Sequence, residues 1–131
     1  MAREVSVILD TCALLWLATG GKKLSRGALK QINDAPAIYV SAISGFEISL
    51  KVRNGKLELS HPVEKWFRQV MEHHGLTILP LALDVCIAAA ELPAVHDDPF
   101  DRFIIAAAKL HDLTVVTADE RFEKYGVTVI C

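Results

Sequence analysis

The chain alternates short apolar runs, rich in β-branched residues, with longer segments that carry the start and stop signals of helices. The first run, residues 5–9, is typical of a buried strand. Asp10-Thr11 can begin a helix directly after it, and Gly20-Gly21 can end that helix. Because strands that alternate with helices in this way form parallel sheets covered on both faces, we expect an α/β fold.

The same signals recur along the chain and define about five strands. The predicted strands are residues 5–9, 37–40, 76–79, 114–117 and 127–130. The predicted helices are residues 11–18, 25–34, 41 or 44 to 54, 62–74, 83–92, 99–111 and 119–125. With 131 residues and no repeat, low-complexity segment or linker, residues 1–131 are expected to form a single domain.

Four acidic residues interrupt stretches that are otherwise apolar. They are Asp10 in VILDTCALLW, Glu47 in SGFEISLK, Asp101 in DPFDRFIIAAA and Asp119 in VVTADERF. A carboxylate in apolar surroundings is costly unless it is protonated, paired or bound to a metal. In open parallel sheets, functional sites gather at the carboxyl ends of the strands, where Asp10 and Asp119 fall. The pattern therefore predicts one acidic site that the fold assembles.

Helix capping offers a structural explanation for three of these acids. Asp10 and Asp119 can cap the helices that follow them, and Asp98 can cap the helix that begins at Pro99. Asp101 then falls in the first turn of that helix, where a negative charge is favourable to the helix dipole. Taken singly, Asp10, Asp101 and Asp119 are each explained by a position at the start of a helix as readily as by a role in an acidic site.

Glu47 lies inside a helix, between Phe46 and Ile48, so capping cannot explain it. Ser44, Glu47 and Lys51 fall on one face of that helix. This face is either a solvated stripe on which Lys51 pairs with Glu47, or it faces the acidic site. In the second case Glu47 binds or positions a metal ion, while Ser44 and Lys51 help to hold phosphate or water.

Four carboxylates suit a hard divalent cation such as Mg²⁺, which prefers oxygen ligands. One or two ions are compatible with the set, and two-ion sites of this kind catalyse in-line displacement at phosphate. No two histidines have the spacing of a ligand pair. His96 could support the acids, but we expect it to be a surface residue of the predicted loop 93–98.

Composition limits the alternatives. Apolar residues make up 52% of the chain, enough for a core, and the formal net charge is −2. If four of the 16 acidic residues serve a metal site, 12 remain against 14 basic ones, a balance compatible with a nucleic-acid substrate without establishing one. Three widely spaced cysteines favour a reduced, cytoplasmic setting. Asp10 interrupts the first apolar run, which argues against a signal peptide or a membrane span.

The strings ILDTCALLW, SAISGFEISLK, HDDPFDRFIIAAA and VVTAD resemble the four signatures of the PIN-domain family, in order and spacing, over nearly the full length of the chain. DPFDR followed by an apolar helix and T-A-D is the most specific part. More narrowly, the chain resembles VapC-type toxins of bacterial type II toxin–antitoxin pairs. The resemblance implies a PIN-like three-layer sandwich with a central, mainly parallel sheet.

The resemblance also implies roles for particular residues. Asp10, Glu47, Asp101 and Asp119 match the acids of a pocket that binds Mg²⁺ or Mn²⁺ and cleaves RNA. Weaker matches to supporting positions of the family are Thr11, Ser44, Arg102 and Thr117. Asp98 matches the aspartate of the D-P pair, for which we expect a capping role. Family members commonly form homodimers and are inhibited by a small antitoxin protein, so both are expected partners.

We therefore expect a magnesium-dependent endoribonuclease toxin that hydrolyses RNA phosphodiester bonds with a metal-activated water. Two alternatives stay open. A magnesium-binding phospho-aspartate domain or phosphatase would also place an aspartate after the first strand, although such phosphatases have a second aspartate where this chain has Cys12. A non-catalytic binding module would use the acids only as caps and surface charges.

Overall fold

A five-stranded sheet with the strand order β3-β2-β1-β4-β5 forms the centre of the protein. The computed structural model describes residues 5–131. Every neighbouring pair of strands is parallel. The strands are β1 (Val7–Leu9), β2 (Ile38–Ser41), β3 (Leu76–Leu79), β4 (Thr114–Val116) and β5 (Val129–Ile130). The predicted sheet is confirmed, and β3 has its predicted bounds. Strands β1 and β5 each begin two residues later than predicted.

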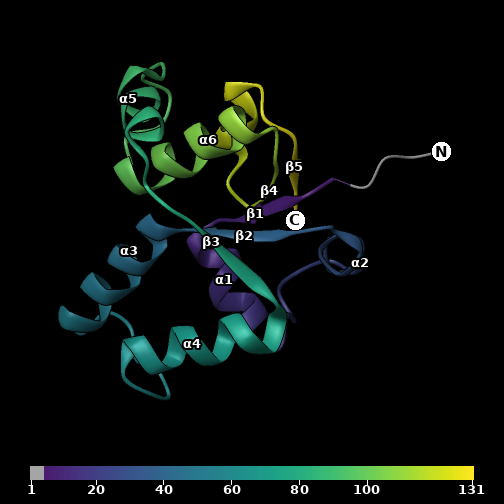
Figure 1. Cartoon of the computed structure of the whole chain (residues 1–131), viewed down its shortest axis with the longest axis vertical. Helices are drawn as coiled ribbons and strands as arrows, with labels where there is room; N and C mark the ends of the chain where they lie inside the picture. Colours follow the sequence, from purple (N-terminus) through teal and green to yellow (C-terminus); the bar gives the residue numbers. More distant parts are fainter. Residues whose placement is uncertain (1–4) are drawn as a thin grey trace.

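Helices cover both faces of the sheet, as expected for a three-layer sandwich. Figure 1 shows α1, α2 and α4 on one side and α5 and α6 on the other. The helices are α1 (Thr11–Ala18), α2 (Arg26–Asp34), α3 (Ala42–Arg53), α4 (Val63–His74), α5 (Leu83–Glu91), α6 (Pro99–His111) and the 3₁₀ helix η1 (Glu120–Tyr125). Among residues 5–131, no helix combines the length and apolar character needed to cross a membrane.

The alternation of side chains along the strands divides the core into two clusters. Val7 and Leu9 of β1 belong to the first cluster, in which Leu14 of α1, Ile32 of α2 and Trp66 of α4 are buried. Ile8 belongs to the second cluster, on the opposite face. Here α6 contributes a continuous buried run because it lies directly on the sheet. That run is Ile104, Ile105, Ala106, Ala107 and Ala108.

The register of the sheet places the ends of its central strands at one level. Leu9 of β1 is paired with Val40 of β2 and with Val116 of β4. Asp10 and Thr117 are the next residues along their strands, so they lie beside each other at the carboxyl edge. Parallel sheets carry their sites at this edge, and the fold therefore positions the first and last of the predicted acidic segments together.

Candidate active site

The four predicted acids line one pocket at the carboxyl edge of the sheet, although they are spread over most of the chain. The pocket has a volume of about 370 Å³. It is lined by Asp10, Thr11, Cys12, Trp16, Glu47, Lys51, Asp98, Asp101, Ala118 and Asp119. Of the predicted supporting residues, Thr11, Lys51 and Asp98 therefore also face the pocket.

Asp10 lies between the end of β1 and the start of α1, and both of its carboxylate oxygens are used. One oxygen accepts the backbone N–H of Ala13 at 2.7 Å and so caps α1. The other accepts a hydrogen bond from the hydroxyl of Thr117. Burial raises the pKa of Asp10, and the charges of Glu47 and Asp119 raise it further, against the lowering effect of these hydrogen bonds. Capping and membership of the acidic site are thus compatible in one residue.

Glu47 is only 8% exposed, so the face of α3 that carries it turns to the pocket rather than to solvent. Its Oε2 atom lies 3.1 Å from the Nζ atom of Lys51. Its Oε1 atom is buried and, among the residues that the structure describes, has no hydrogen-bond partner. Beside it, the fully buried Ser44 shares a 2.9 Å hydrogen bond with Thr11, which fixes α3 against α1.

Asp101 projects from the first turn of α6, which Asp98 caps by accepting the N–H of Phe100 at 2.9 Å. Burial, followed by the negative charges of Asp98, Asp10, Glu47 and Asp119, raises the pKa of Asp101 to about 7. The pocket therefore holds more negative charge than its own basic groups neutralise.

Asp119 follows β4 and caps η1 through the backbone N–H of Arg121 at 3.0 Å. The Arg121 side chain also binds both carboxylate oxygens, at 3.0 and 2.8 Å. These Arg121 contacts hold the pKa of Asp119 well below its usual range. The hydroxyl of Thr117, which donates to Asp10, accepts the backbone N–H of Asp119 at 3.1 Å and so links the two acids.

Two residues differ from their predicted surroundings. Arg102 points away from the pocket and donates to backbone carbonyls at the end of α5 and in the loop that follows. His96, expected at the surface, is only 1% exposed and touches both Asp101 and Asp119, so that expectation was wrong. The spacing of residues in the sequence does not predict the burial of His96 beside the acids, because its contact with Asp119 spans 23 positions.

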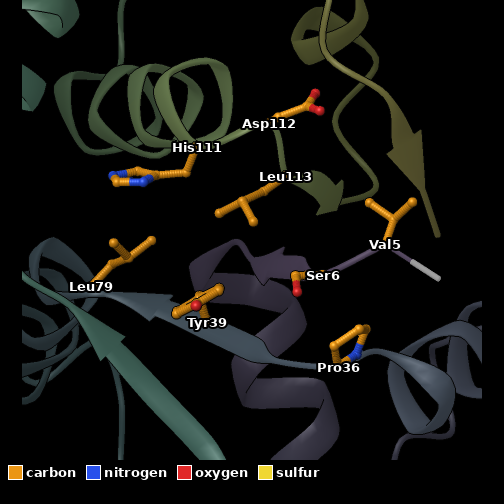
Figure 2. A pocket seen from close by; sticks show the side chains of 8 residues that line it. All are labelled: Val5, Ser6, Pro36, Tyr39, Leu79, His111, Asp112 and Leu113. Atoms are coloured by element: carbon orange, nitrogen blue, oxygen red, sulfur yellow. The ribbon is translucent and has the colours of Figure 1, made fainter. Parts of the chain in front are cut away.

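A second, larger cavity of about 670 Å³ lies elsewhere (Figure 2). Its lining includes Ser6 and Leu113, which directly precede β1 and β4, and Pro36, two residues before β2, so it lies near the amino ends of these strands. The lining residues are Val5, Ser6, Pro36, Tyr39, Leu79, His111, Asp112 and Leu113. Asp112 is the one carboxylate in this set. The concentration of acids therefore identifies the smaller pocket as the chemically competent one.

The residues of the smaller pocket fit a divalent cation. The orphaned Oε1 atom of Glu47 is a buried acceptor for which a cation would be a partner. Burial raises the pKa of Asp101 most, and the negative charges of the neighbouring carboxylates raise it further; a bound cation would offset those charges. The donors are carboxylate oxygens, which suit Mg²⁺, Mn²⁺ and similar hard ions.

An all-parallel sheet with helices on both faces and a carboxylate pocket at its carboxyl edge defines the class, an α/β protein with an acidic site suited to metal ions. The family follows from the sequence itself. The family model described as PIN domain matches residues 7–127, and the chain belongs to the PIN-domain family.

Relatives with names agree with this family. The chain is 31% identical, over 121 residues and 92% of each chain, to Ribonuclease VapC22 of Mycobacterium tuberculosis. VapBC2 from Rickettsia felis, solved bound to a promoter DNA fragment, has a similar fold, with a TM-score of 0.70 at 14% identity, covering 95% of this chain and 96% of that one. A toxin–antitoxin complex from Klebsiella pneumoniae gives a TM-score of 0.65 at 20% identity, with the same coverage. The predicted family and fold class are confirmed.

Proposed function

We propose that this protein is a divalent-metal-dependent endoribonuclease and the toxin of a toxin–antitoxin pair. The observation that carries the proposal is the pocket in which Asp10, Glu47, Asp101 and Asp119 converge, where one buried oxygen of Glu47 has no hydrogen-bond partner within residues 5–131. The similarity over nearly the full chain to a protein named a ribonuclease supports RNA as the substrate.

Asp10, Glu47, Asp101 and Asp119 would bind the cation, for which we propose Mg²⁺, with Mn²⁺ as a substitute. When bound, the ion supplies an activated water and stabilises charge that develops on the phosphate. Thr117 orients Asp10, and Lys51 holds one oxygen of Glu47 while its side chain stays 41% exposed. An ammonium group at the rim of the pocket is well placed to bind a phosphate of the substrate.

Trp16 offers a surface for a single-stranded substrate. It lines the pocket, and the Nζ atom of Lys23 lies 6.0 Å from the centre of its ring. An aromatic ring beside a cation is the usual combination in sites that stack a base and contact the backbone of single strands. This arrangement supports an RNA strand that enters the pocket across α1.

We also propose a small antitoxin and a second copy of this chain as partners. The named toxin–antitoxin structures of similar fold support the antitoxin. Large apolar side chains are exposed on α3 and α5, and a second copy could cover them. They are Phe46, Leu50, Leu83 and Ile87. Phe46, which precedes Glu47, also contacts Phe100 of α6 at 5.9 Å between ring centres. Exposed large apolar side chains of this kind favour an interaction surface. The three free cysteines support a cytoplasmic setting.

The decisive experiment is cleavage of a single-stranded RNA by the purified protein with Mg²⁺, followed by analysis of the new ends. We expect 5′-phosphate ends and loss of cleavage in EDTA. Asp10→Asn should abolish cleavage, whereas Asp112→Asn should not. Asp112 lies in the other cavity with a φ of 53°, a conformation that asparagine tolerates. Ends with a 2′,3′-cyclic phosphate, or full activity in EDTA, would overturn the mechanism.

A further inference from the structure

The buried imidazole of His96 lies directly behind the acidic pocket and has no role in the mechanism described above. Its Nε2 atom lies 3.0 Å from Oδ2 of Asp119 and 2.9 Å from Oδ2 of Asp101. The ring packs edge-on against Phe122, with 5.8 Å between the ring centres. His96 is absent from the lining of the pocket, so it touches the acids from the protein side and not from the substrate side.

The other ring nitrogen decides where the proton of His96 resides. The backbone N–H of Asp98 points at Nδ1, with the two nitrogens 3.2 Å apart. An N–H group donates only to a nitrogen without a proton, so the hydrogen of the ring is on Nε2. With its proton there, Nε2 donates to carboxylates and cannot ligate a metal ion. The geometry therefore gives His96 a role through Asp101 and Asp119, and not as a ligand.

The main chain that carries His96 is itself held by two side chains. The hydroxyl of Tyr125 accepts the N–H of His96 at 2.7 Å and donates to the carbonyl of Pro93 at 2.7 Å. The guanidinium of Arg102 also donates to the carbonyls of Pro93 and His96, at 2.9 and 3.3 Å. These contacts leave the imidazole little freedom to turn away from the acids.

Asp101 and Asp119 need such a group because they come from different parts of the chain, the first turn of α6 and the start of η1. Two carboxylates of like charge repel each other and would turn apart without a donor between them. We propose that His96 is a positioning residue of the active site, whose Nε2–H holds the carboxylates of Asp119 and Asp101 in the arrangement that binds the cation. The inference rests on the proposed function for the use of that cation in catalysis.

Two substitutions distinguish the effect of the Nε2–H donor of His96 from the effect of its ring packing. His96→Phe keeps a ring against Phe122 but removes the Nε2–H donor. His96→Gln can place an amide N–H near the position of Nε2. The matched control is His111→Gln at the exposed end of α6. We expect His96→Phe to bind Mn²⁺ about 10–100-fold more weakly in calorimetry without RNA, the effect usual for outer partners of metal ligands.

In the same titration, His96→Gln should recover most of the affinity and His111→Gln should match the unmodified protein. In cleavage assays, kcat of His96→Phe should fall and recover partly at high Mg²⁺, while KM for RNA stays within about threefold of the original. Unchanged Mn²⁺ affinity in His96→Phe, or an equal loss in His96→Gln, would overturn the role of the donor.

A measurement on the unmodified protein covers the case in which a variant does not fold. Imidazole ¹⁵N spectra should show His96 with a protonated Nε2 and an unprotonated Nδ1, both before and after addition of Mg²⁺. A proton on Nδ1, or loss of the Nε2 proton when Mg²⁺ is added, would refute the proposal. Failure of the proposed function has a different signature, since the unmodified protein would then bind no Mn²⁺ and cut no RNA, while the tautomer could still be determined.

Discussion

Thr117 and Asp10 are 107 positions apart, yet the hydroxyl of Thr117 donates directly to the carboxylate of Asp10 across the neighbouring strands β4 and β1. The same hydroxyl accepts the backbone N–H of Asp119. One buried side chain thus orients the two acids that end the central strands. The sheet register makes this possible, because Leu9 and Val116 are paired one residue earlier.

Thr117→Val should destabilise the protein by about 1–3 kcal/mol, because it leaves one oxygen of the buried Asp10 carboxylate without its donor while keeping the side-chain shape. The hydrogen bond from Thr117 lowers the pKa of Asp10, so its loss should raise that pKa further. Urea denaturation measures the loss of stability, and an NMR titration of the Asp10 carboxyl group measures its pKa. Thr117→Ser retains the hydroxyl and is the control. Equal stability of the valine and serine variants would show that the hydrogen bond between Thr117 and Asp10 does not stabilise the fold.

Glu47→Gln should abolish the stabilisation that Mg²⁺ gives, without lowering the melting temperature of the metal-free protein. The reason is that Glu47 holds a buried oxygen with no partner, so removing its charge relieves a cost. Glu64→Gln on α4 is the matched control, since Glu64 also pairs with a basic residue four positions on but is exposed. Thermal scans with and without Mg²⁺ decide the question. Undiminished stabilisation of Glu47→Gln by Mg²⁺ would remove Glu47 from the cation site.

Arg121→Ala should strengthen metal binding. Arg121 occupies both oxygens of Asp119 from an exposed position, and it therefore competes with any cation for that carboxylate. Exposed ion pairs are weak, so we expect a gain in Mn²⁺ affinity of about two- to fivefold. Arg68→Ala, which removes an arginine from an exposed pair on α4, should leave the affinity unchanged. A loss of affinity in Arg121→Ala would instead show that Arg121 supports Asp119 in the bound state.

The metal-free protein should lose stability as the pH rises from 5 to 8. The pKa of Asp101 is about 7 in the folded protein and near 3.8 when unperturbed. The folded state therefore binds a proton that the unfolded state has released, and this contribution to stability disappears as pH passes through about 7. The pKa of Asp10 is raised as well and acts in the same direction. Burial lowers the pKa of His74, which acts in the opposite direction, and Asp119, with its lowered pKa, is ionised in both states throughout this range.

Melting temperatures at pH 5 and pH 8 test this slope. Asp101→Asn should reduce the change in melting temperature between the two pH values. Mg²⁺ should raise the melting temperature most at pH 8, because the carboxylates are ionised there and the ion displaces no proton. An equal pH dependence of the melting temperature in Asp101→Asn and in the unmodified protein, in the same buffers and at constant ionic strength, would contradict the assignment.

Local signals were sufficient to predict most of the fold. Strand β3 and helix α6 have their predicted bounds because Gly75, Asp98 and Pro99 mark their starts. Ser41, one of the two predicted caps for α3, is the one that accepts an N–H, from Ile43. Strand β5 is shorter than predicted because it pairs with only two residues of β4. Its length depends on a partner and not on its own sequence.

The acidic site was predictable where it depends on strand ends and less so where it depends on packing. Asp10 and Asp119 follow strands, so their convergence follows from a parallel sheet. The burial of Glu47 depends on how α3 turns against α1, through the contact of Thr11 with Ser44. The surroundings of His96 are set by a loop whose backbone contacts the sequence does not reveal.

The pocket and the helix starts share their residues. Asp10, Asp98 and Asp119 each face the pocket, and each caps the helix that follows it. An alanine at any of these positions would remove a charge from the site and an acceptor from a helix terminus at once. Inactive variants intended for toxicity or complex studies should therefore carry asparagine, which caps helices as well as aspartate does. Replacement of one of these acids by a residue that cannot cap would therefore remove a charge from the pocket and cost about 0.5–2 kcal/mol of stability in a single step.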